Sequence, residues 1–444
     1  MKCEECRELL IAYHKGELQD EQRAAAEAHL AQCVACQCEA EGARRLLATI
    51  ERAEEEPIER VAQKIILEGI ERRASDIHVQ PQAERLRIRY RVDGVLHDAI
   101  ILPTYVAEPL ATRLRQMAEM PLTERGVPQD GRIHVRHEER EYDLRVSSLP
   151  SLHGESIVIR IFDASVMDVG LGDIGLHADL RAQFSELLAR PSGLVVVAGP
   201  TGSGKTTTLY AALKSLVRPE VALFSIEDPV EYRIEGVTQV HLNRKTGLDF
   251  AAAMRYIMRQ DPDVILCGEV RNRETLELCV QAALTGHLVL TTLHTNDAVQ
   301  VIRRMAEIGL DRFLIADSLI GVLAQRLVRK VHLECGTLHE LTDAQRQWLR
   351  HAGVAEPPDT LTRGMGCAGC RNTGHRGRTT IAELLVVDDE LRRMIAGDAD
   401  LQDVERLAAS KRVPMTADAA GKVLAGEVAI SEAMRVTGFL PEYQ

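Results

Sequence analysis

A glycine-rich loop at residues 199–206 constrains the fold of this 444-residue chain more than any other feature. An apolar run at 194–198 leads straight into the loop, and residues 206–213 have the pattern of a helix. Glycines let backbone N–H groups close around phosphate oxygens, and the N-terminus of the next helix adds the positive end of its dipole. This order predicts a phosphate-binding P-loop in an α/β domain. The loop consists of Gly199, Pro200, Thr201, Gly202, Ser203, Gly204, Lys205 and Thr206.

Residues in and after this loop predict nucleotide chemistry. Lys205 is expected to reach the β- and γ-phosphates, and the Thr206 hydroxyl to ligate Mg²⁺. An apolar strand at 264–267 ends in Gly268-Glu269, and we expect Glu269 to position or polarise the attacking water. Glu227 begins a run of three carboxylates after an apolar strand at 221–224, and with the P-loop upstream we expect Glu227 to be a catalytic residue. Without the P-loop upstream, this run would indicate a solvated turn.

Apolar periodicity divides the chain into segments. Short apolar strands alternate with helical patterns from about residue 178 to 330, which predicts a parallel sheet covered by helices. Residues 86–162 follow period two instead, with turn signals at Asp93-Gly94 and Asp130-Gly131, which predicts an α+β domain with an antiparallel sheet. We expect a small unit at 1–50, the α+β domain at 57–165, a linker at 166–177, and the α/β domain at 178–444 with a Cys/His subdomain at about 330–380.

Composition excludes some classes of function. The chain has 54 basic and 66 acidic residues, a net charge of −12, and only 3% aromatic residues. A strongly anionic chain gains nothing from counterion release on DNA, and few aromatic rings are present to stack on bases. No nucleic-acid partner is therefore expected. No apolar run approaches 18 residues and the start lacks a signal-peptide core, so we expect a cytoplasmic protein.

Four sequence blocks in a fixed order resemble the secretion ATPases of type II secretion and type IV pilus systems. They are the P-loop and the runs at 227–231, 258–271 and 285–296, which correspond to the Walker A, Asp, Walker B and His boxes of that family. The likeness continues upstream and covers roughly residues 57–440. It implies that the α/β domain is RecA-like, that the α+β domain is PAS-like, and that six subunits form a ring.

The resemblance also implies roles for residues outside the P-loop. Arg132 and Arg145 would be arginine fingers that reach a neighbour's γ-phosphate, which suits a planar cation facing developing charge. Alternatively, both arginines could be surface strand residues that form ion pairs. His287 and His294 of the His box would sense the γ-phosphate and couple subunits, whereas an isolated histidine more often has a structural role. The remaining expected nucleotide contacts are Thr207 and Arg91.

Eight of the ten cysteines fall into two clusters, one near each end, and clustered thiols in a reducing compartment indicate metal ligands. Assembly ATPases of this family usually carry two CxxC pairs about thirty residues apart. Here the second pair is Cys367 and Cys370, and the first reads His332-Leu-Glu-Cys335. Histidine nitrogen still suits a tetrahedral site, so we expect a closed structural Zn²⁺ site with no catalytic role. Retraction ATPases generally lack this element, which favours an assembly motor.

The N-terminal cluster resembles the small zinc-binding domains of anti-sigma factors. His29 and Cys33 are one helical turn apart and Cys36 lies one turn further, while Cys3 or Cys6 would complete four ligands. In the resemblance the ligands are Cys3, His29, Cys33 and Cys36. The four cysteines alone form a competing set with an unusually long spacer. We expect this unit to dock an unknown protein partner.

Together these features predict a cytoplasmic, hexameric ATPase with ATP, Mg²⁺ and Zn²⁺ as cofactors. It would drive pilin or pseudopilin assembly through an inner-membrane platform protein, with peripheral membrane association through such partners. A pilus-retraction or conjugation-type motor uses the same chemistry and is an alternative. A second alternative is a regulator that uses the ATPase body as a nucleotide-dependent switch and captures a partner through residues 1–50.

Overall fold

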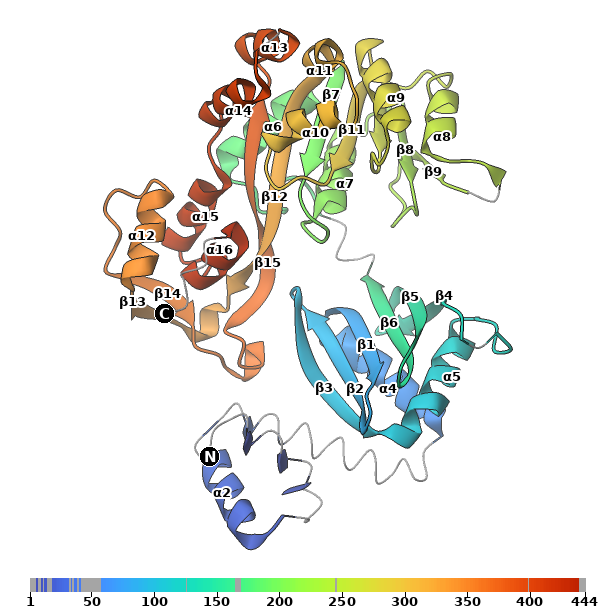
Figure 1. The fold of residues 1–444 in the computed structure, drawn as a ribbon, viewed down its shortest axis with the longest axis vertical. Helices are drawn as coiled ribbons and strands as arrows, with labels where there is room; N and C mark the ends of the chain where they lie inside the picture. Colours follow the sequence, from blue (N-terminus) through green and yellow to red (C-terminus); the bar gives the residue numbers. More distant parts are fainter. Residues whose placement is uncertain are drawn as a thin grey trace. The chain divides into compact units, whose positions relative to one another are not determined.

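The computed structural model describes residues 57–438 except 125, 164–168, 244–245 and 398, together with short stretches among residues 5–40. The chain divides into two compact units, one of residues 1–165 and 366–373 and the other of residues 166–365 and 374–444 (Figure 1). Cys3 lies outside the described residues, so its predicted role as a ligand is not addressed. In the N-terminal region, the longest described element is helix α2 (Asp20–Leu30).

The first unit is an α+β domain. Its six-stranded sheet has the order β3-β2-β1-β6-β5-β4, and each strand pair is antiparallel. The period-two prediction is confirmed, because Leu86, Ile88 and Tyr90 of β2 are all buried in one core with α4 and α5. Whether this domain is PAS-like stays a prediction. The elements are α4 (Ile58–Glu71), β1 (Ala74–Pro81), β2 (Arg85–Val92), β3 (Val95–Pro103), α5 (Ala107–Met117), β4 (Gln129–His137), β5 (Arg140–Ser151) and β6 (Gly154–Asp163).

One predicted turn in this unit is wrong. Asp130 and Gly131 lie inside β4, where they pair with Ser147 and Val146 of β5. A Cβ atom at Gly131 would come within 2.2 Å of the carbonyl oxygen of Ala118, so the glycine permits a close backbone approach instead of a turn. The other turn signal, Asp93-Gly94, does join β2 to β3, and both of its residues have positive φ.

The second unit is built on a seven-stranded sheet of order β15-β12-β7-β11-β10-β8-β9. Its neighbours are parallel except for the antiparallel pair of β12 and β15. Strands β7, β10 and β11 are buried along their whole length, as expected for strands covered on both faces. The predicted α/β fold class is confirmed. The strands are β7 (Gly193–Ala198), β8 (Leu223–Glu227), β9 (Val237–His241), β10 (Val264–Cys267), β11 (Leu288–Leu293), β12 (Leu319–Val331) and β15 (His375–Val386).

Alternate residues of β7 belong to two hydrophobic cores, one on each face of the sheet. Val195 and Val197 pack with residues of α6 and α7, whereas Leu194 and Val196 pack with residues of α8, α9 and α11. Strands β13 (Gly336–Glu340) and β14 (Thr360–Gly364) form a separate antiparallel pair. The helices are α6 (Ala178–Leu188), α7 (Lys205–Leu216), α8 (Phe250–Ile257), α9 (Arg273–Leu284), α10 (Gln300–Glu307), α11 (Arg312–Ser318), α12 (Asp343–His351), α13 (Asp389–Ala396), α14 (Leu401–Ser410), α15 (Met415–Leu424) and α16 (Ile430–Thr437).

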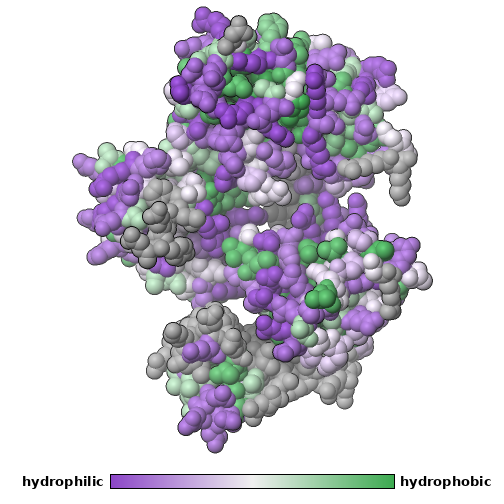
Figure 2. Space-filling view, viewed as in Figure 1, coloured by the Kyte–Doolittle hydropathy of each residue, from purple (hydrophilic) through white to green (hydrophobic). Residues whose placement is uncertain are grey.

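The visible surface is mostly hydrophilic, with small scattered apolar patches (Figure 2). Such scattered patches are normal for the surface of a folded protein. Among the described helices, none is both long and apolar enough for a membrane span.

Candidate nucleotide-binding site and Cys/His clusters

The predicted P-loop follows β7 at the carboxyl edge of the parallel sheet. Lys205 begins α7, so the strand, loop and helix occur in the predicted order. Strands β8, β10 and β11 end at this same edge, since Cys267 pairs with both Ile226 and Thr291, and Ala198 pairs with Leu293. Ligands of open α/β sheets bind beyond the carboxyl ends of the strands. The sheet therefore brings the acidic residues and one histidine to the side of the P-loop.

The P-loop depends on its glycines. Gly199, Gly202 and Gly204 have φ values of 149°, 77° and 88°, which other residues rarely adopt. Lys205 Nζ donates to the carbonyl oxygens of Gly199 and Pro200, each at 2.9 Å. Burial lowers the pKa of Lys205, and the nearby Glu269 carboxylate partly opposes this shift. A desolvated ammonium held across its own loop is placed to meet phosphate oxygens.

Glu269 follows β10 by two residues and faces cations. Its Oε1 atom lies 2.6 Å from Arg271 Nη2, and its side chain is 20% exposed. The same carboxylate acts on the pKa of both Lys205 and His294, so these three side chains share one electrostatic environment. A partly exposed carboxylate near a P-loop lysine is suited to orient a water molecule.

Glu227 lies at the carboxyl end of β8, and its predicted catalytic role stays a prediction. The strand starts and ends later than expected, so Glu227 is its last residue and does not lie in a solvated turn. It is buried, and it accepts hydrogen bonds from Tyr210, Ser225 and Gln239. Tyr210 belongs to α7, and its hydroxyl also accepts a bond from the backbone N–H of Glu231. Glu227 therefore ties the helix of the P-loop to β8.

The two histidines of the predicted His box lie at opposite ends of β11. His294 follows the strand on the P-loop side, and its pKa is lowered first by burial and then by Lys205 and Arg271, with Glu269 opposing. His287 precedes the strand, with its Nδ1 atom 2.8 Å from the carbonyl oxygen of Ala282. Six strand residues separate them by about 20 Å. His294 therefore lies on the P-loop side of the sheet and His287 on the other, and the catalytic roles of both stay predictions.

Three predicted nucleotide contacts lie in the first unit. Arg132 and Arg145 are direct partners across β4 and β5, so they share one face of the sheet. The Arg145 guanidinium lies 5.4 Å from the ring centroid of Phe162. Arg91 contacts Asp76 at 3.6 Å and donates to the carbonyl oxygen of Gly94. Their roles toward nucleotide stay predictions.

Sequence reasoning missed two buried polar residues beside the P-loop region. Gln325 of β12 contacts Ser203 and Thr208, and Glu383 of β15 accepts a bond from the backbone of Ala298, four residues after His294. Gln325 directly follows an apolar run at 319–324, and Glu383 lies inside one at 381–386. A polar residue inside or next to such a run is the signal that could have found them.

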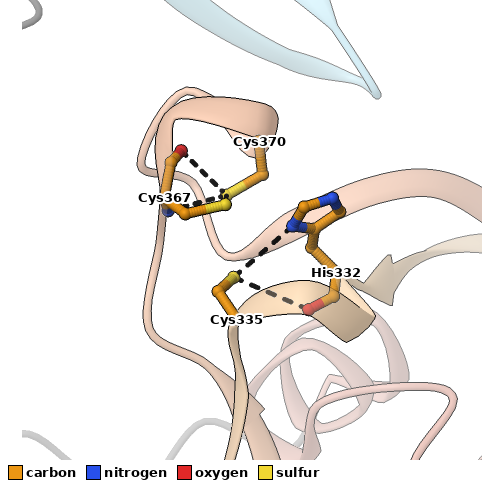
Figure 3. A group of neighbouring side chains, drawn as sticks. All are labelled: His332, Cys335, Cys367 and Cys370. Atoms are coloured by element: carbon orange, nitrogen blue, oxygen red, sulfur yellow. Dashed lines mark hydrogen bonds between the residues drawn. The ribbon is translucent and has the colours of Figure 1, made fainter.

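Four side chains near the C-terminal end of β12 point toward one another (Figure 3). They are His332, Cys335, Cys367 and Cys370, and their candidate ligand atoms all lie within 4.8 Å. His332 Nδ1 is 3.6 Å from Cys335 Sγ, and the Sγ atoms of Cys367 and Cys370 are 3.8 Å apart. Ligands placed about 2.0 and 2.3 Å from one tetrahedral metal would be about 3.6–3.8 Å apart. The predicted ligand set therefore fits Zn²⁺ in chemistry and spacing.

A second group forms near the N-terminus. Cys6, His29 and Cys36 come together, with His29 Nε2 3.3 Å from Cys36 Sγ. The backbone N–H of Cys33 donates to the carbonyl oxygen of His29, so the predicted one-turn spacing continues past the end of α2. Cys33 packs against this cluster but is not among the three grouped ligands. The sequence offered Cys3 or Cys6 as the first ligand. Cys6 lies in this group, and Cys3 lies outside the described residues.

Comparison with known proteins agrees with this architecture. A family model described as "Type II/IV secretion system protein" matches residues 51–435, and a zinc-finger model matches residues 3–37. Type II secretion system protein E of Pseudomonas aeruginosa is 43% identical over 390 residues, covering 87% of this chain and 77% of that protein. Type II secretion system ATPase E of Vibrio cholerae is 41% identical over 388 residues, with the same coverage of 87% and 77%.

Solved structures show the same fold. The pilus retraction motor PilT with bound ADP is 27% identical, with a TM-score of 0.57 over 84% of this chain and 96% of that chain. The DotB ATPase of Legionella pneumophila has a TM-score of 0.61 at 21% identity, over 85% of this chain and 95% of that one. The predicted family is confirmed: the chain belongs to the type II/IV secretion system protein family.

Proposed function

We propose that this chain is an ATP-hydrolysing motor that powers assembly of pilins or pseudopilins in a secretion or pilus system. The observation that carries the proposal is that Glu269 and His294 lie close to the P-loop lysine, Lys205, at one edge of the sheet. Membership of the secretion family and relatives named as secretion ATPases support it.

Each part of the site has an assigned task in this proposal. The backbone of residues 199–206 cradles the phosphates, helped by the N-terminus of α7, which includes Thr207. Lys205 leaves its two loop carbonyls to contact the β- and γ-phosphates. The Thr206 hydroxyl holds Mg²⁺, which supplies charge neutralisation when bound. Glu269 orients the attacking water, while Glu227 fixes α7.

We further propose that the active form is a ring of six subunits. A face of the first unit presents Arg132 and Arg145 together. Cations held this way would complete the pocket of a neighbouring subunit by stabilising charge on the transferred phosphoryl group. Arg91 would contact the nucleotide from the same unit. The ring would work at the inner face of the cytoplasmic membrane, bound to a platform protein of the secretion machine.

The two Cys/His groups are proposed as structural zinc sites. In the C-terminal group, one histidine and three cysteines supply four ligands and leave no open position for catalysis. The N-terminal group would hold a small unit that docks a protein partner. Cys3 or Cys33 would supply its fourth ligand beside Cys6, His29 and Cys36.

The ATPase is tested by Lys205→Ala. Loss of the ammonium removes the main charge that contacts the phosphates, so ATP turnover should fall by at least about 100-fold. The measurement is phosphate release by the purified full-length chain. Lys64→Ala, which changes an exposed lysine of α4, is the matched control and should hydrolyse ATP normally. Wild-type protein that binds ATP tightly with negligible turnover would refute the motor and favour the nucleotide-dependent regulator.

The C-terminal zinc site is tested by metal content. Cys367→Ser should remove one equivalent of zinc and lower the melting temperature, since structural zinc contributes directly to folding. Cys279→Ser, a buried cysteine outside both groups, should keep the wild-type zinc content. Equal zinc in both variants would contradict the assignment.

The kind of filament is tested in cells. A gene deletion scored in parallel for protein export, surface pili, twitching and DNA uptake separates the assembly roles from retraction. Loss of export or of pili supports an assembly motor. Retained pili without twitching would instead support a retraction motor.

A further inference from the structure

Gln325 is a buried amide whose two ends are both bonded to the P-loop segment. The residue is 1% exposed in the middle of β12. Its Nε2 atom donates to the carbonyl oxygen of Ser203 at 2.8 Å, and its Oε1 atom accepts from Thr208 Oγ1 at 2.8 Å. Ser203 lies in the loop and Thr208 in the first turn of α7. One side chain thus bridges the loop and the helix that follows it.

The backbone around Gln325 is also fitted to the two ends of the loop. A Cβ atom at Gly199 would come within 2.5 Å of the carbonyl oxygen of Gln325, and one at Gly204 would come within 3.2 Å of its Nε2 atom. Strand β12 pairs with β7 through Ala324 and Ala198, and with β15 through Gln325 and Ala382. Paired on both sides, this strand gives the loop a fixed surface.

The bond to Ser203 sets the direction of the next peptide N–H. In a trans peptide the carbonyl and the following N–H point in opposite directions. Holding Ser203 oxygen toward Gln325 therefore aims the N–H of Gly204 away from β12 and into the loop. Glycine-rich backbone otherwise has many accessible conformations, most of which would turn this donor elsewhere. An N–H aimed inward is what a phosphate oxygen requires.

We infer that Gln325 is a positioning residue that holds the P-loop in its phosphate-accepting form before nucleotide binds. This inference rests on the proposed function, because it assumes that the loop binds ATP. A loop that is competent only part of the time binds with an affinity reduced by that fraction. Once nucleotide is bound, its own contacts hold the loop. Removing Gln325 should therefore weaken binding and leave the chemical step intact.

The test uses Gln325→Met, which keeps the side-chain length and removes both hydrogen bonds. In the full-length chain, Kd for ATP and for ADP and the KM for ATP should rise about 10-fold, with kcat within about twofold. Thr208→Val removes one of the same bonds from the other side and should raise KM in the same direction. The double variant should be no worse than the worse single variant, because both changes break one hydrogen-bond chain.

Thr380→Val is the matched control, since Thr380 is 2% exposed on β15 and pairs with Leu327, beyond the contacts of Gln325 with the loop. If Gln325→Met and Thr380→Val lower the melting temperature alike and neither changes KM, Gln325 is only a core amide and the inference is wrong. If Gln325→Met does not fold, an unchanged KM in Thr208→Val overturns the inference equally. Wild-type protein without ATP turnover would instead refute the proposed function, so the two failures are distinguishable.

Discussion

Two glutamates lie at the carboxyl ends of two neighbouring parallel strands, one as the last strand residue and one two residues beyond, yet their surroundings are opposite. Glu227 closes β8 and is 4% exposed, with its oxygens bonded to the neutral groups of Tyr210, Ser225 and Gln239. Glu269 follows β10, keeps a 20% exposed side chain, and faces Arg271 and Lys205. A similar place in the sheet therefore gives one carboxylate that is fully engaged and one that remains accessible.

These surroundings suit Glu227 to a positioning role and Glu269 to a chemical role. Burial, reinforced by the Glu227 carboxylate, raises the pKa of the Tyr210 hydroxyl, so tyrosine remains a donor at any physiological pH. Glu227 thereby holds α7, whose N-terminus carries the P-loop lysine. Glu269 has solvent access and cationic neighbours. The comparison predicts that changing Glu269 affects turnover and that changing the partners of Glu227 affects stability.

The largest effect is expected from Glu269→Gln. The amide keeps the size of the side chain but is a poor base for the attacking water, so kcat should fall by about 10³-fold. ATP affinity should stay within a few-fold, because Lys205 and the loop are unchanged. The measurements are single-turnover hydrolysis and ATP binding. Glu274→Gln, which changes an exposed carboxylate at the start of α9, is the control. Comparable turnover in the Glu269 variant would end its assigned role.

The sequence was most informative where a local pattern determines the backbone. The P-loop, the strand at 264–267 and the period-two strands of the first unit are all present. The sequence was least informative where a residue's contact partner is distant along the chain. Asp130-Gly131 has the composition of a turn, but a close approach to Ala118 places it in a strand. The resemblance to the His box also grouped His287 with His294, although they lie at opposite ends of β11.

The buried polar contacts were hidden for the same reason. Gln325 and Thr208 are 117 residues apart, and no local pattern states that their side chains meet. The N-terminal cluster shows the limit of spacing arguments. Either Cys3 or Cys6 could complete a set with His29, Cys33 and Cys36, and the four cysteines alone form another set. The chain path brings Cys6 to His29 and Cys36 among the described residues. Only three-dimensional placement decides among sets of similar spacing.

A smaller effect, on stability, is expected from Tyr210→Phe. The change leaves the buried Glu227 carboxylate without one of its donors, which should lower the free energy of unfolding by about 1–3 kcal/mol. The kcat at saturating ATP should change much less than in the Glu269 variant. Urea unfolding of the nucleotide-free chain measures this. Tyr256→Phe, at a tyrosine that is 61% exposed, should be neutral. A large loss of kcat with unchanged stability would contradict the positioning role of Glu227 and indicate that it takes part in the chemical step.

The smallest effect is a pH-dependent proton uptake at His294. In the nucleotide-free protein, burial, then Lys205 and Arg271, hold the pKa of His294 below its usual value of 6.5, so the ring is neutral at neutral pH. Bound phosphates bring negative charge beside Lys205, which favours the imidazolium and raises this pKa. ATP binding should therefore take up a fraction of a proton near pH 6 and none near pH 8.

Calorimetry in buffers of different ionisation enthalpy measures the uptake. It should vanish in His294→Asn and persist in His287→Asn, because His287 lies at the far end of β11. Uptake that disappears in the His287 variant instead would place that histidine at the nucleotide and contradict the separation of the two.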